Sequence, residues 1–169
     1  RQKLSPSKYF DDLVLDLNLL SSWIVVVNKV DIVFHLSGNT SIYAAEEDPD
    51  KCLMSTILPV THFVTASKRL KLKPLMVFAS TATVYGDTSK IPVSEANQPT
   101  PVTNYDLHKY LAEQILINSI NNNLINARIL RLANVYGPSL IETKSIDRGV
   151  LSKITRMAFQ GKNIAVYGG

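Results

Sequence analysis

Short β-rich runs alternate with longer segments of helical length along this chain, and this alternation limits the fold more than any other feature of the sequence. The expected strands are Leu13–Leu15, Asp31–Leu36, Leu75–Ala79, Ala127–Leu132 and Ile164–Tyr167. The expected helices between them are Leu19–Asn28, Lys51–Arg69, Thr103–Ile120 and Arg148–Gln160. Strands separated by helices need right-handed crossover connections. The sequence therefore predicts parallel strands in a layered α/β fold.

The chain has the length and composition of one globular domain. It contains 169 residues, of which 46% are hydrophobic and 19% are charged, and these values predict a single sizeable core. The most apolar stretch, residues 13–30, is interrupted by side chains such as Asp16 and Lys29, so no membrane span is expected. Cys52 is the only cysteine. We therefore expect no internal disulfide, a reducing compartment and, in the absence of Cys/His clusters, no metal site.

The net charge of the chain has a simple structural interpretation. The formal charge is +4, and a basic cluster follows one of the expected helices, at Lys68, Arg69, Lys71 and Lys73. Cations are favourable at the C-terminus of a helix, and no aromatic residues interleave with this cluster to stack on bases. We therefore expect a solvated helix end and no nucleic-acid partner.

A hydroxyl, a phenol and an amine occur at spacings that suit proton transfer. Thr81 follows the expected strand Leu75–Ala79, at the end of the strand where a doubly wound sheet places its chemistry. Tyr105 and Lys109 stand four residues apart and share one face of a helix. An ammonium there can stabilise the phenolate and lower the pKa of Tyr105, so that the phenol acts as a general base. A surface Tyr/Lys pair and a threonine strand cap form the alternative interpretation.

Three segments follow one another in the order of a known family. They are His35-Leu36-Ser37-Gly38, the hydroxyl run Ser80–Gly86, and Arg131-Leu132-Ala133-Asn134-Val135-Tyr136-Gly137-Pro138. Together they resemble the extended short-chain dehydrogenase/reductase family of NAD-dependent epimerases and dehydratases, and within it nucleotide-sugar epimerases of the UDP-glucose 4-epimerase type. The similarity runs from about Asp11 to the last residue.

The resemblance implies a fold class and a domain assignment. The fold class is α/β, a doubly wound parallel sheet of the Rossmann-like type. The Gly-rich phosphate turn of the family precedes the segment that begins near Asp11, and it is not found among the seven glycines of this chain. We therefore expect a fragment that lacks the first βαβ part and most of the C-terminal substrate domain. Residues 1–169 then form a partial NAD(P)-binding domain, with about 139–169 leading into the substrate-binding part.

The resemblance also assigns roles to individual residues. Tyr105 would exchange a proton with a sugar hydroxyl while hydride moves to and from the nicotinamide, Lys109 would hold the nicotinamide ribose, and Thr81 would hydrogen-bond the same sugar oxygen. The cofactor-binding positions implied are Asp16, Leu17, Leu36, Ser37, Gly38, Ser55, Tyr105, Lys109 and Ala133. The substrate-binding positions implied are Thr81, Tyr105, Asn134, Ala165, Val166 and Tyr167. Pro59 stands where the family commonly has Gly, so we expect its helix to begin or bend differently.

Two residues in the hydroxyl run narrow the choice of reaction. Ala82 and Thr83 stand where sugar 4,6-dehydratases of the family carry Asp and Glu, and neither can serve as the acid or base that dehydration needs. The sequence therefore favours an NAD-dependent nucleotide-sugar epimerase. Its expected form is a cytoplasmic homodimer paired through helices 51–69 and 103–120, with no membrane partner.

Two alternatives remain open. One is another extended-family oxidoreductase or dehydratase acting on nucleotide sugars, with NADP not excluded, since the residue that selects the cofactor belongs to a strand of the family that this fragment is expected to lack. The other is a non-catalytic dinucleotide-binding protein on the same fold.

Overall fold

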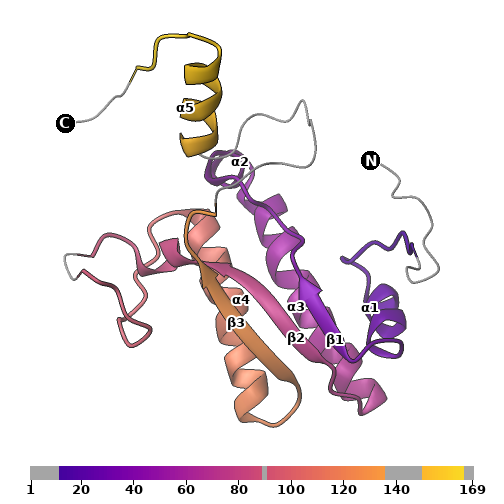
Figure 1. The fold of residues 1–169 in the computed structure, drawn as a ribbon. Coiled ribbons are helices and arrows are strands. Elements are labelled where there is room, and N and C mark those ends of the chain that lie inside the picture. The colour runs from indigo at the N-terminus through magenta and orange to yellow at the C-terminus, as the bar shows by residue number, and fades with distance from the viewer. Residues whose placement is uncertain (1–11, 89–90, 136–149, 166–169) are drawn as a thin grey trace. The chain divides into compact units, whose positions relative to one another are not determined.

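The structure is a computed structural model that describes residues 12–88, 91–135 and 150–165 (Figure 1). The chain divides into two compact units, residues 1–131 and 132–169. The first unit contains α1 (Leu20–Val27), β1 (Ile32–His35), α2 (Ile42–Glu47), α3 (Pro49–Leu70), β2 (Leu75–Thr81), the 3₁₀-helix η1 (Ala82–Tyr85), α4 (Asn104–Asn121) and β3 (Asn126–Leu132), whose last residue reaches the second unit. In the second unit the helix among the described residues is α5 (Val150–Phe159).

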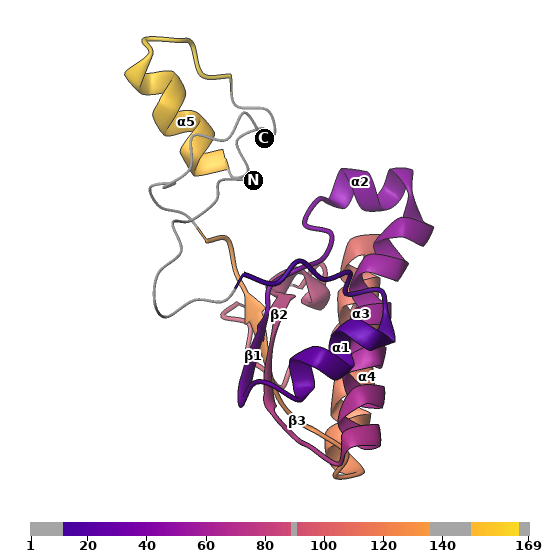
Figure 2. The ribbon, with the colours of Figure 1, turned by 90° about the vertical axis from the view of Figure 1, so that its right-hand side faces the viewer.

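The strands form one sheet in the order β1-β2-β3. β1 and β2 are parallel, with Ile32 opposite Leu75 and His35 opposite Phe78. Helix α3 connects β1 to β2, and α4 connects β2 to β3, which are the crossovers that parallel neighbours require. Figure 2 shows α1, α3 and α4 on the same face of the sheet. The layered α/β fold expected from the alternation of elements is confirmed.

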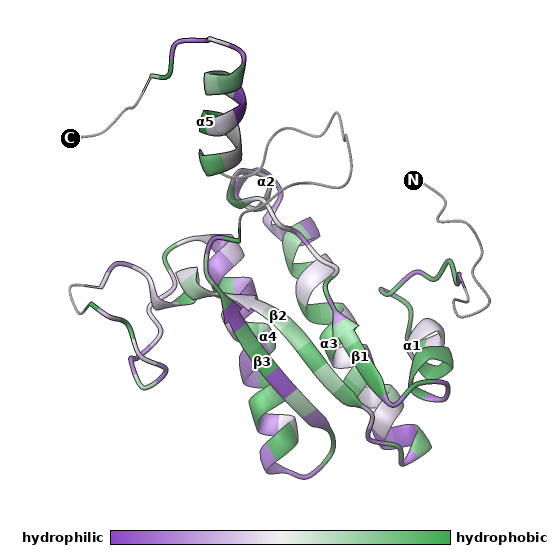
Figure 3. Cartoon of the chain, viewed as in Figure 1, coloured by the Kyte–Doolittle hydropathy of each residue, from purple (hydrophilic) through white to green (hydrophobic). Residues whose placement is uncertain are grey.

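The hydrophobic core lies between that face of the sheet and its helices. Its largest fully buried side chains come from each of these elements, with Trp23 on α1, Phe63 on α3, Phe78 on β2 and Leu116 on α4. Figure 3 shows that β1 and β2 are apolar over most of their length and more polar toward their carboxyl ends. Strand side chains alternate between the two faces, so Phe34, which points away from these helices, is 67% exposed. The core therefore fixes the helices over the strand ends that carry the candidate site.

Capping residues determine where helix α3 begins. Pro49 occupies the first turn of α3, and the Asp48 carboxylate accepts a hydrogen bond from the Lys51 amide at 2.9 Å. These features suit a helix N-terminus, because the first amides have no partner within the helix. α3 therefore starts two residues before the predicted Lys51. Pro59 lies inside α3, which runs without a break from Pro49 to Leu70.

Three predictions about secondary structure need correction or limits. Leu13–Leu15 is not a strand, and Val14 is 81% exposed. A strand needs a neighbouring strand to pair with its backbone groups. Among the described residues no strand pairs with this segment. The short helix α2 was not predicted, although Ser41 caps it by accepting a hydrogen bond from the Ala44 amide. Of the expected strand Ile164–Tyr167, the first two residues are not in a strand and the last two lie outside the described residues.

Neither a membrane-spanning helix nor a group of metal-binding side chains is found among the described residues. Within them, no helix has the length and hydropathy of a membrane span. The same part of the chain contains no group of three or more His, Cys, Asp or Glu residues placed to hold a metal ion.

Candidate functional site

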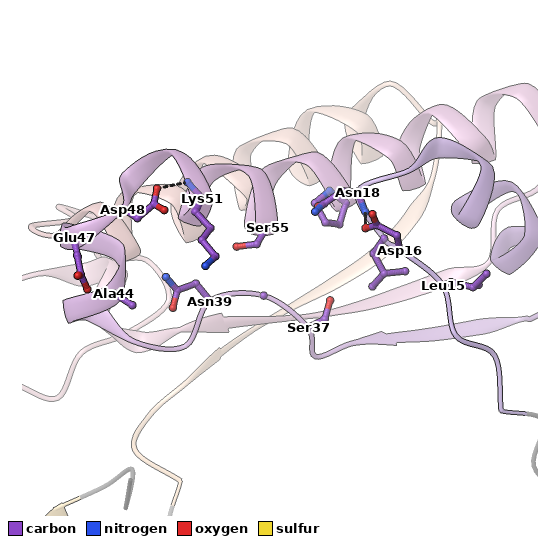
Figure 4. Close-up of a pocket in the computed structure, with 13 residues that line it drawn as sticks. Leu15, Asp16, Asn18, Ser37, Asn39, Ala44, Glu47, Asp48, Lys51 and Ser55 are labelled. Atoms are coloured by element: carbon purple, nitrogen blue, oxygen red, sulfur yellow. Dashed lines mark hydrogen bonds between the residues drawn. The ribbon is translucent and has the colours of Figure 1, made fainter. Parts of the chain in front are cut away.

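A pocket of about 880 Å³ opens where β1 ends. Its walls come from the segment before α1, the turn after β1, α2 and the first half of α3. The lining residues are Leu15, Asp16, Leu17, Asn18, Ser37, Gly38, Asn39, Ala44, Glu47, Asp48, Lys51, Ser55 and Pro59. Figure 4 shows Ser37 and Asn39 on the turn, facing Lys51 and Ser55 on α3. The carboxyl ends of parallel strands are where open α/β sheets bind ligands.

Gly38 connects this pocket to the buried amine of Lys109. Its φ of +130° lies in a region that favours glycine. A Cβ built there would lie 3.5 Å from the Ser55 carbonyl oxygen, 3.9 Å from the Thr56 hydroxyl and 4.0 Å from Lys109 Nζ. The Thr56 hydroxyl is buried and has no hydrogen-bond partner in the structure. The turn at Gly38 therefore lies close to the Thr56 hydroxyl and to Lys109 Nζ.

Lys109 is held against the end of β2. Its side chain is 5% exposed, and Nζ donates a hydrogen bond to the Ala79 carbonyl oxygen at 2.8 Å. The same nitrogen lies 5.0 Å from the centre of the Phe78 ring, a cation–π distance. Burial lowers the pKa of the Lys109 amine. The ammonium is thus directed at the sheet rather than at solvent.

Tyr105 precedes Lys109 by one helical turn and is partly buried. Burial raises the pKa of the phenol, and the nearby Asp106 carboxylate, with a smaller contribution from Cys52, raises it further. The sequence predicted that Lys109 lowers the pKa of Tyr105. In the structure the pKa of Tyr105 is raised instead, so this prediction is wrong. The reason is geometric, because Lys109 Nζ bonds to the backbone of β2.

Thr81 ends β2 and begins a chain of hydrogen bonds to α4. Its Oγ1 accepts from the Thr83 amide at 3.2 Å and lies 2.8 Å from Thr83 Oγ1. The Thr83 hydroxyl donates to Asp106 Oδ1. Asp106 also belongs to the capping box of α4, in which Oδ2 accepts from the Thr103 hydroxyl at 2.7 Å. These hydrogen bonds join the end of β2 and the 3₁₀-helix η1 to the first turn of α4.

A second polar network fixes α4 against the strands. Glu113, two turns after Tyr105 on the same helix face, is fully buried. Its carboxylate accepts from the Ser80 hydroxyl and forms an ion pair with Arg131, with Nη2 to Oε2 at 2.7 Å. The hydrogen bond to Glu113 raises the pKa of the Arg131 guanidinium. This network ties α4 to the end of β2 and to β3.

The structure brings together part of the predicted site. Asp16, Leu17, Ser37, Gly38 and Ser55 line the pocket. Thr81, Tyr105 and Lys109 lie on the neighbouring β2 and α4. The predicted Leu36 is 70% exposed and is not among the lining residues. Ala133, Asn134 and Ala165 belong to the second unit and are exposed. Val166 and Tyr167 lie outside the described residues.

The sequence reasoning missed several residues that line the pocket. Asn18, Asn39 and Lys51 are polar examples. Asn39 follows Gly38 directly, and Lys51 lies one helical turn before Ser55, so both positions adjoin residues that were predicted. These spacings are the signal that could have identified them.

Comparison with known proteins gives one family and one fold. Residues 11–169 match the model of the family described as NAD dependent epimerase/dehydratase. The chain is similar to a UDP-glucose 4-epimerase of Mycoplasma genitalium, with 32% identity over 82% of this chain and 41% of the relative. It is also similar to UDP-glucuronic acid decarboxylase 1 of Xenopus tropicalis, with 29% identity over 83% of this chain and 33% of that protein.

Solved structures share the fold. The UDP-glucose 4-epimerase of Thermotoga maritima, solved with UDP-glucose, aligns with a TM-score of 0.80 and 23% identity over 91% of this chain and 50% of that one. The chain therefore spans half or less of each of these three proteins.

Proposed function

Because this chain belongs to the NAD-dependent epimerase/dehydratase family, we propose that it carries part of the active site of a nucleotide-sugar epimerase of the UDP-glucose 4-epimerase type. One observation supports this proposal most strongly. The Lys109 amine bonds to Ala79, two residues before Thr81, and approaches the Gly38 turn of the pocket. A proton-transfer group and a ligand pocket therefore adjoin at the ends of neighbouring strands.

The pocket residues fit part of an NAD molecule. The φ of Gly38 provides a close backbone approach. Asp16 and Ser37, which also line the pocket, add acceptors for ribose hydroxyls. The family's Gly-rich phosphate turn is not among these residues. We propose that this unit holds the adenosine part and the nicotinamide ribose, the latter through Lys109.

The proposed chemistry needs one hydride acceptor and one proton carrier. Bound NAD would take a hydride from the sugar carbon and return it. Tyr105 exchanges the proton of the sugar hydroxyl, and Thr81 hydrogen-bonds that oxygen. Since burial raises the pKa of Tyr105, the phenol is held in its protonated form, which suits proton donation to the sugar oxygen during re-reduction. Positive charge brought near the phenol would favour the opposite transfer.

Epimerisation is favoured over dehydration by the side chains beside Thr81. Ala82 has no ionisable group, and the Thr83 hydroxyl is bonded to Asp106. Neither can protonate a leaving hydroxyl in the way that elimination of water requires. A single net redox step with NAD or NADP is the second candidate, since a protein of similar fold, RMD from Pseudomonas aeruginosa, was solved with NADPH.

The assembly and the wider domain are further parts of the proposal. We propose a homodimer paired through α3 and α4, because both helices carry exposed apolar side chains, namely Leu53, Met54, Leu107, Leu111, Ile117 and Ile120. Sedimentation showing only monomer would contradict it. A cytoplasmic location fits the buried free thiol of Cys52. Residues from about 139 onward would lead into the substrate-binding part.

The test is a hydride-exchange assay on the whole protein. UDP-, GDP- and dTDP-sugars are incubated with NAD while the 4-epimer and the absorbance of reduced nicotinamide are measured. We expect an epimer to form without net reduction of the cofactor. Steady net turnover of cofactor would favour the oxidoreductase instead. Absence of both signals with every sugar would contradict the proposed chemistry and leave the non-catalytic binding protein.

A further inference from the structure

Glu46 joins the short helix α2 to the start of α4. One of its carboxylate oxygens accepts a hydrogen bond from the Asn104 amide at 2.7 Å, and the other accepts from the Asn104 side-chain amide at 2.8 Å. Hydrogen bonds to an ionised carboxylate are stronger than those between neutral groups, and a pair of them fixes orientation as well as distance. Figure 2 shows α2 next to the first turns of α4. Two segments that lie 58 positions apart in the sequence are therefore joined by one carboxylate.

The amide of Asn104 has no partner inside its own helix. The first amides of a helix lack one, because the residues that would accept from them precede the helix. The capping box of α4 satisfies two neighbouring amides, that of Thr103 through Asp106 Oδ2 at 3.3 Å and that of Asp106 through Thr103 Oγ1 at 3.2 Å. The Asn104 amide is not part of these bonds, and Glu46 supplies its acceptor. The start of α4 is thus capped once locally and once by α2.

The helix that carries Glu46 also forms part of the pocket wall. Glu47 lines the pocket, whereas Glu46 is not one of the lining residues. On α4, Tyr105 follows Asn104 directly and belongs to the turn that Glu46 holds. The charge of Glu46 also acts one turn further along α4, where it partly offsets the lowering of the His108 pKa by burial. The Glu46 carboxylate therefore acts on α4, while its neighbour faces the pocket.

We propose that Glu46 is a positioning residue that holds the first turn of α4, and with it the Tyr105 phenol, in a fixed place relative to the pocket. The proposal rests on the proposed function. Proton transfer between the phenol and a sugar hydroxyl needs the two oxygens within about 2.6 to 3.2 Å of each other, so a small displacement of this turn costs turnover. Lys109 is held separately by the Ala79 carbonyl. Loss of Glu46 would therefore misplace the phenol without releasing the amine.

The test measures turnover and cofactor affinity separately in the whole protein. Glu46→Ala removes both hydrogen bonds, and we expect kcat for epimer formation to fall about tenfold, the scale of one hydrogen bond to a charged group. The Kd for NAD should not change, because Glu46 does not line the pocket. Glu46→Gln keeps an oxygen for the Asn104 amide and can pair its own amide with the Asn104 side chain. It should therefore retain most of the turnover.

A hydrogen-bonded contact at the other end of α4 provides the matched control. Lys73 Nζ donates to the Asn123 side-chain oxygen at 2.7 Å and to the Asn123 carbonyl oxygen, just beyond the last residue of α4. Lys73→Ala therefore removes a comparable charged pair of hydrogen bonds at the end of the helix far from Tyr105. We expect it to lower the melting temperature about as much as Glu46→Ala does, with kcat unchanged.

Asn104→Ala checks that the effect passes through Asn104. This variant loses the side-chain bond and keeps the backbone amide that donates to Glu46, so kcat should fall by less than in Glu46→Ala. Combined with Glu46→Ala it should cause no further loss, because both changes remove the same contact.

The outcomes distinguish this proposal from the proposed function. If wild-type protein forms the epimer and Glu46→Ala has the wild-type kcat, the positioning role is overturned while the epimerase stands. If Lys73→Ala lowers kcat as much as Glu46→Ala does, the effect is one of helix stability and the positioning role is again overturned. If Glu46→Gln loses as much turnover as Glu46→Ala, charge and not positioning is responsible. If the wild type forms no epimer from any sugar, both proposals are overturned.

Discussion

The two halves of the candidate site differ in how their polar groups are satisfied. On the side of α4, the polar side chains of Thr83, Asp106, Lys109 and Glu113 each bond to a group on another segment of the chain. On the side of the pocket, Ser55 bonds only within its own helix, to the Cys52 carbonyl at 3.1 Å. Asp16 and Asn39 accept from amides two residues away.

This difference indicates two kinds of task. Groups that must hold one geometry during a reaction are fixed by bonds between elements, because a side chain that is already oriented has less freedom to lose in the transition state. Groups that bind a ligand keep capacity for new hydrogen bonds. The α4 side therefore has the character of a catalytic frame, and the pocket side that of a binding surface.

The largest expected effect is on the stability of the α4 side. Glu113→Gln leaves Arg131 without its carboxylate while Ser80 keeps an acceptor. Removing one partner of a buried ion pair costs about 3 kcal/mol or more, and Arg131 is only 20% exposed. We expect the free energy of unfolding, measured by urea titration, to fall by about 3 kcal/mol. Glu95→Gln, on an exposed loop, is the matched control, and an equal loss there would contradict the assignment.

The next effect is the acid sensitivity of the core beside the pocket. His35 is 3% exposed between Trp23 and Phe78, and burial, with a smaller contribution from Lys109, lowers its pKa to about 4 from 6.5. Between these values the unfolded chain binds the proton and the folded chain does not. The free energy of unfolding therefore falls as pH drops from about 6.5 to 4, by up to about 3 kcal/mol, and this loss is absent above 6.5.

The variant His35→Phe isolates this contribution. Phenylalanine keeps an aromatic ring in the same place and cannot take up a proton. Urea unfolding of both proteins at pH 7.5 and pH 4.5 should show a smaller acid loss in the variant. His108, whose pKa is also lowered by burial, contributes equally to both proteins. Identical pH profiles would show that His35 is not the group responsible.

The catalytic frame is tested by removing one oxygen. Tyr105→Phe in the whole protein should lower turnover by about a hundredfold or more, the scale of lost general acid–base catalysis, while the melting temperature changes little. Tyr110→Phe deletes the same hydroxyl one residue beyond Lys109 and should retain turnover. Unchanged turnover in Tyr105→Phe would exclude the proposed proton transfer.

The smallest expected effect is at the pocket turn. Gly38→Ala meets no short contact, since its Cβ has at least 3.5 Å to its neighbours, but a φ of +130° strains any residue with a Cβ. The cost is about 1 to 2 kcal/mol, which thermal unfolding detects as a lower melting temperature. Ser37→Ala, at the neighbouring position, should change stability by much less. Equal melting temperatures for wild type and Gly38→Ala would show that the turn adapts.

The sequence predicted the fold better than it predicted the site. Asp31–Leu36 and Thr103–Ile120 were predicted to within a residue or two of β1 and α4, because their periodicity and caps are local. The strand at Leu13–Leu15 failed because a strand depends on a partner that the run itself does not encode. Of the pocket, Asp16, Ser37, Gly38 and Ser55 were expected together only through a family resemblance, and Lys51 was missed.

The sequence alone determined the alternation of strands and helices and the placing of Tyr105, Lys109 and Glu113 on one helix face, because these follow from backbone periods of two and 3.6 residues. It did not determine which partners those side chains find. Lys109 bonds to Ala79 and not to Tyr105, Thr83 bonds to Asp106, and burial raises the pKa of Tyr105. Only the tertiary structure decides these outcomes, because hydrogen-bond direction and desolvation depend on groups far apart in the chain that packing brings into contact.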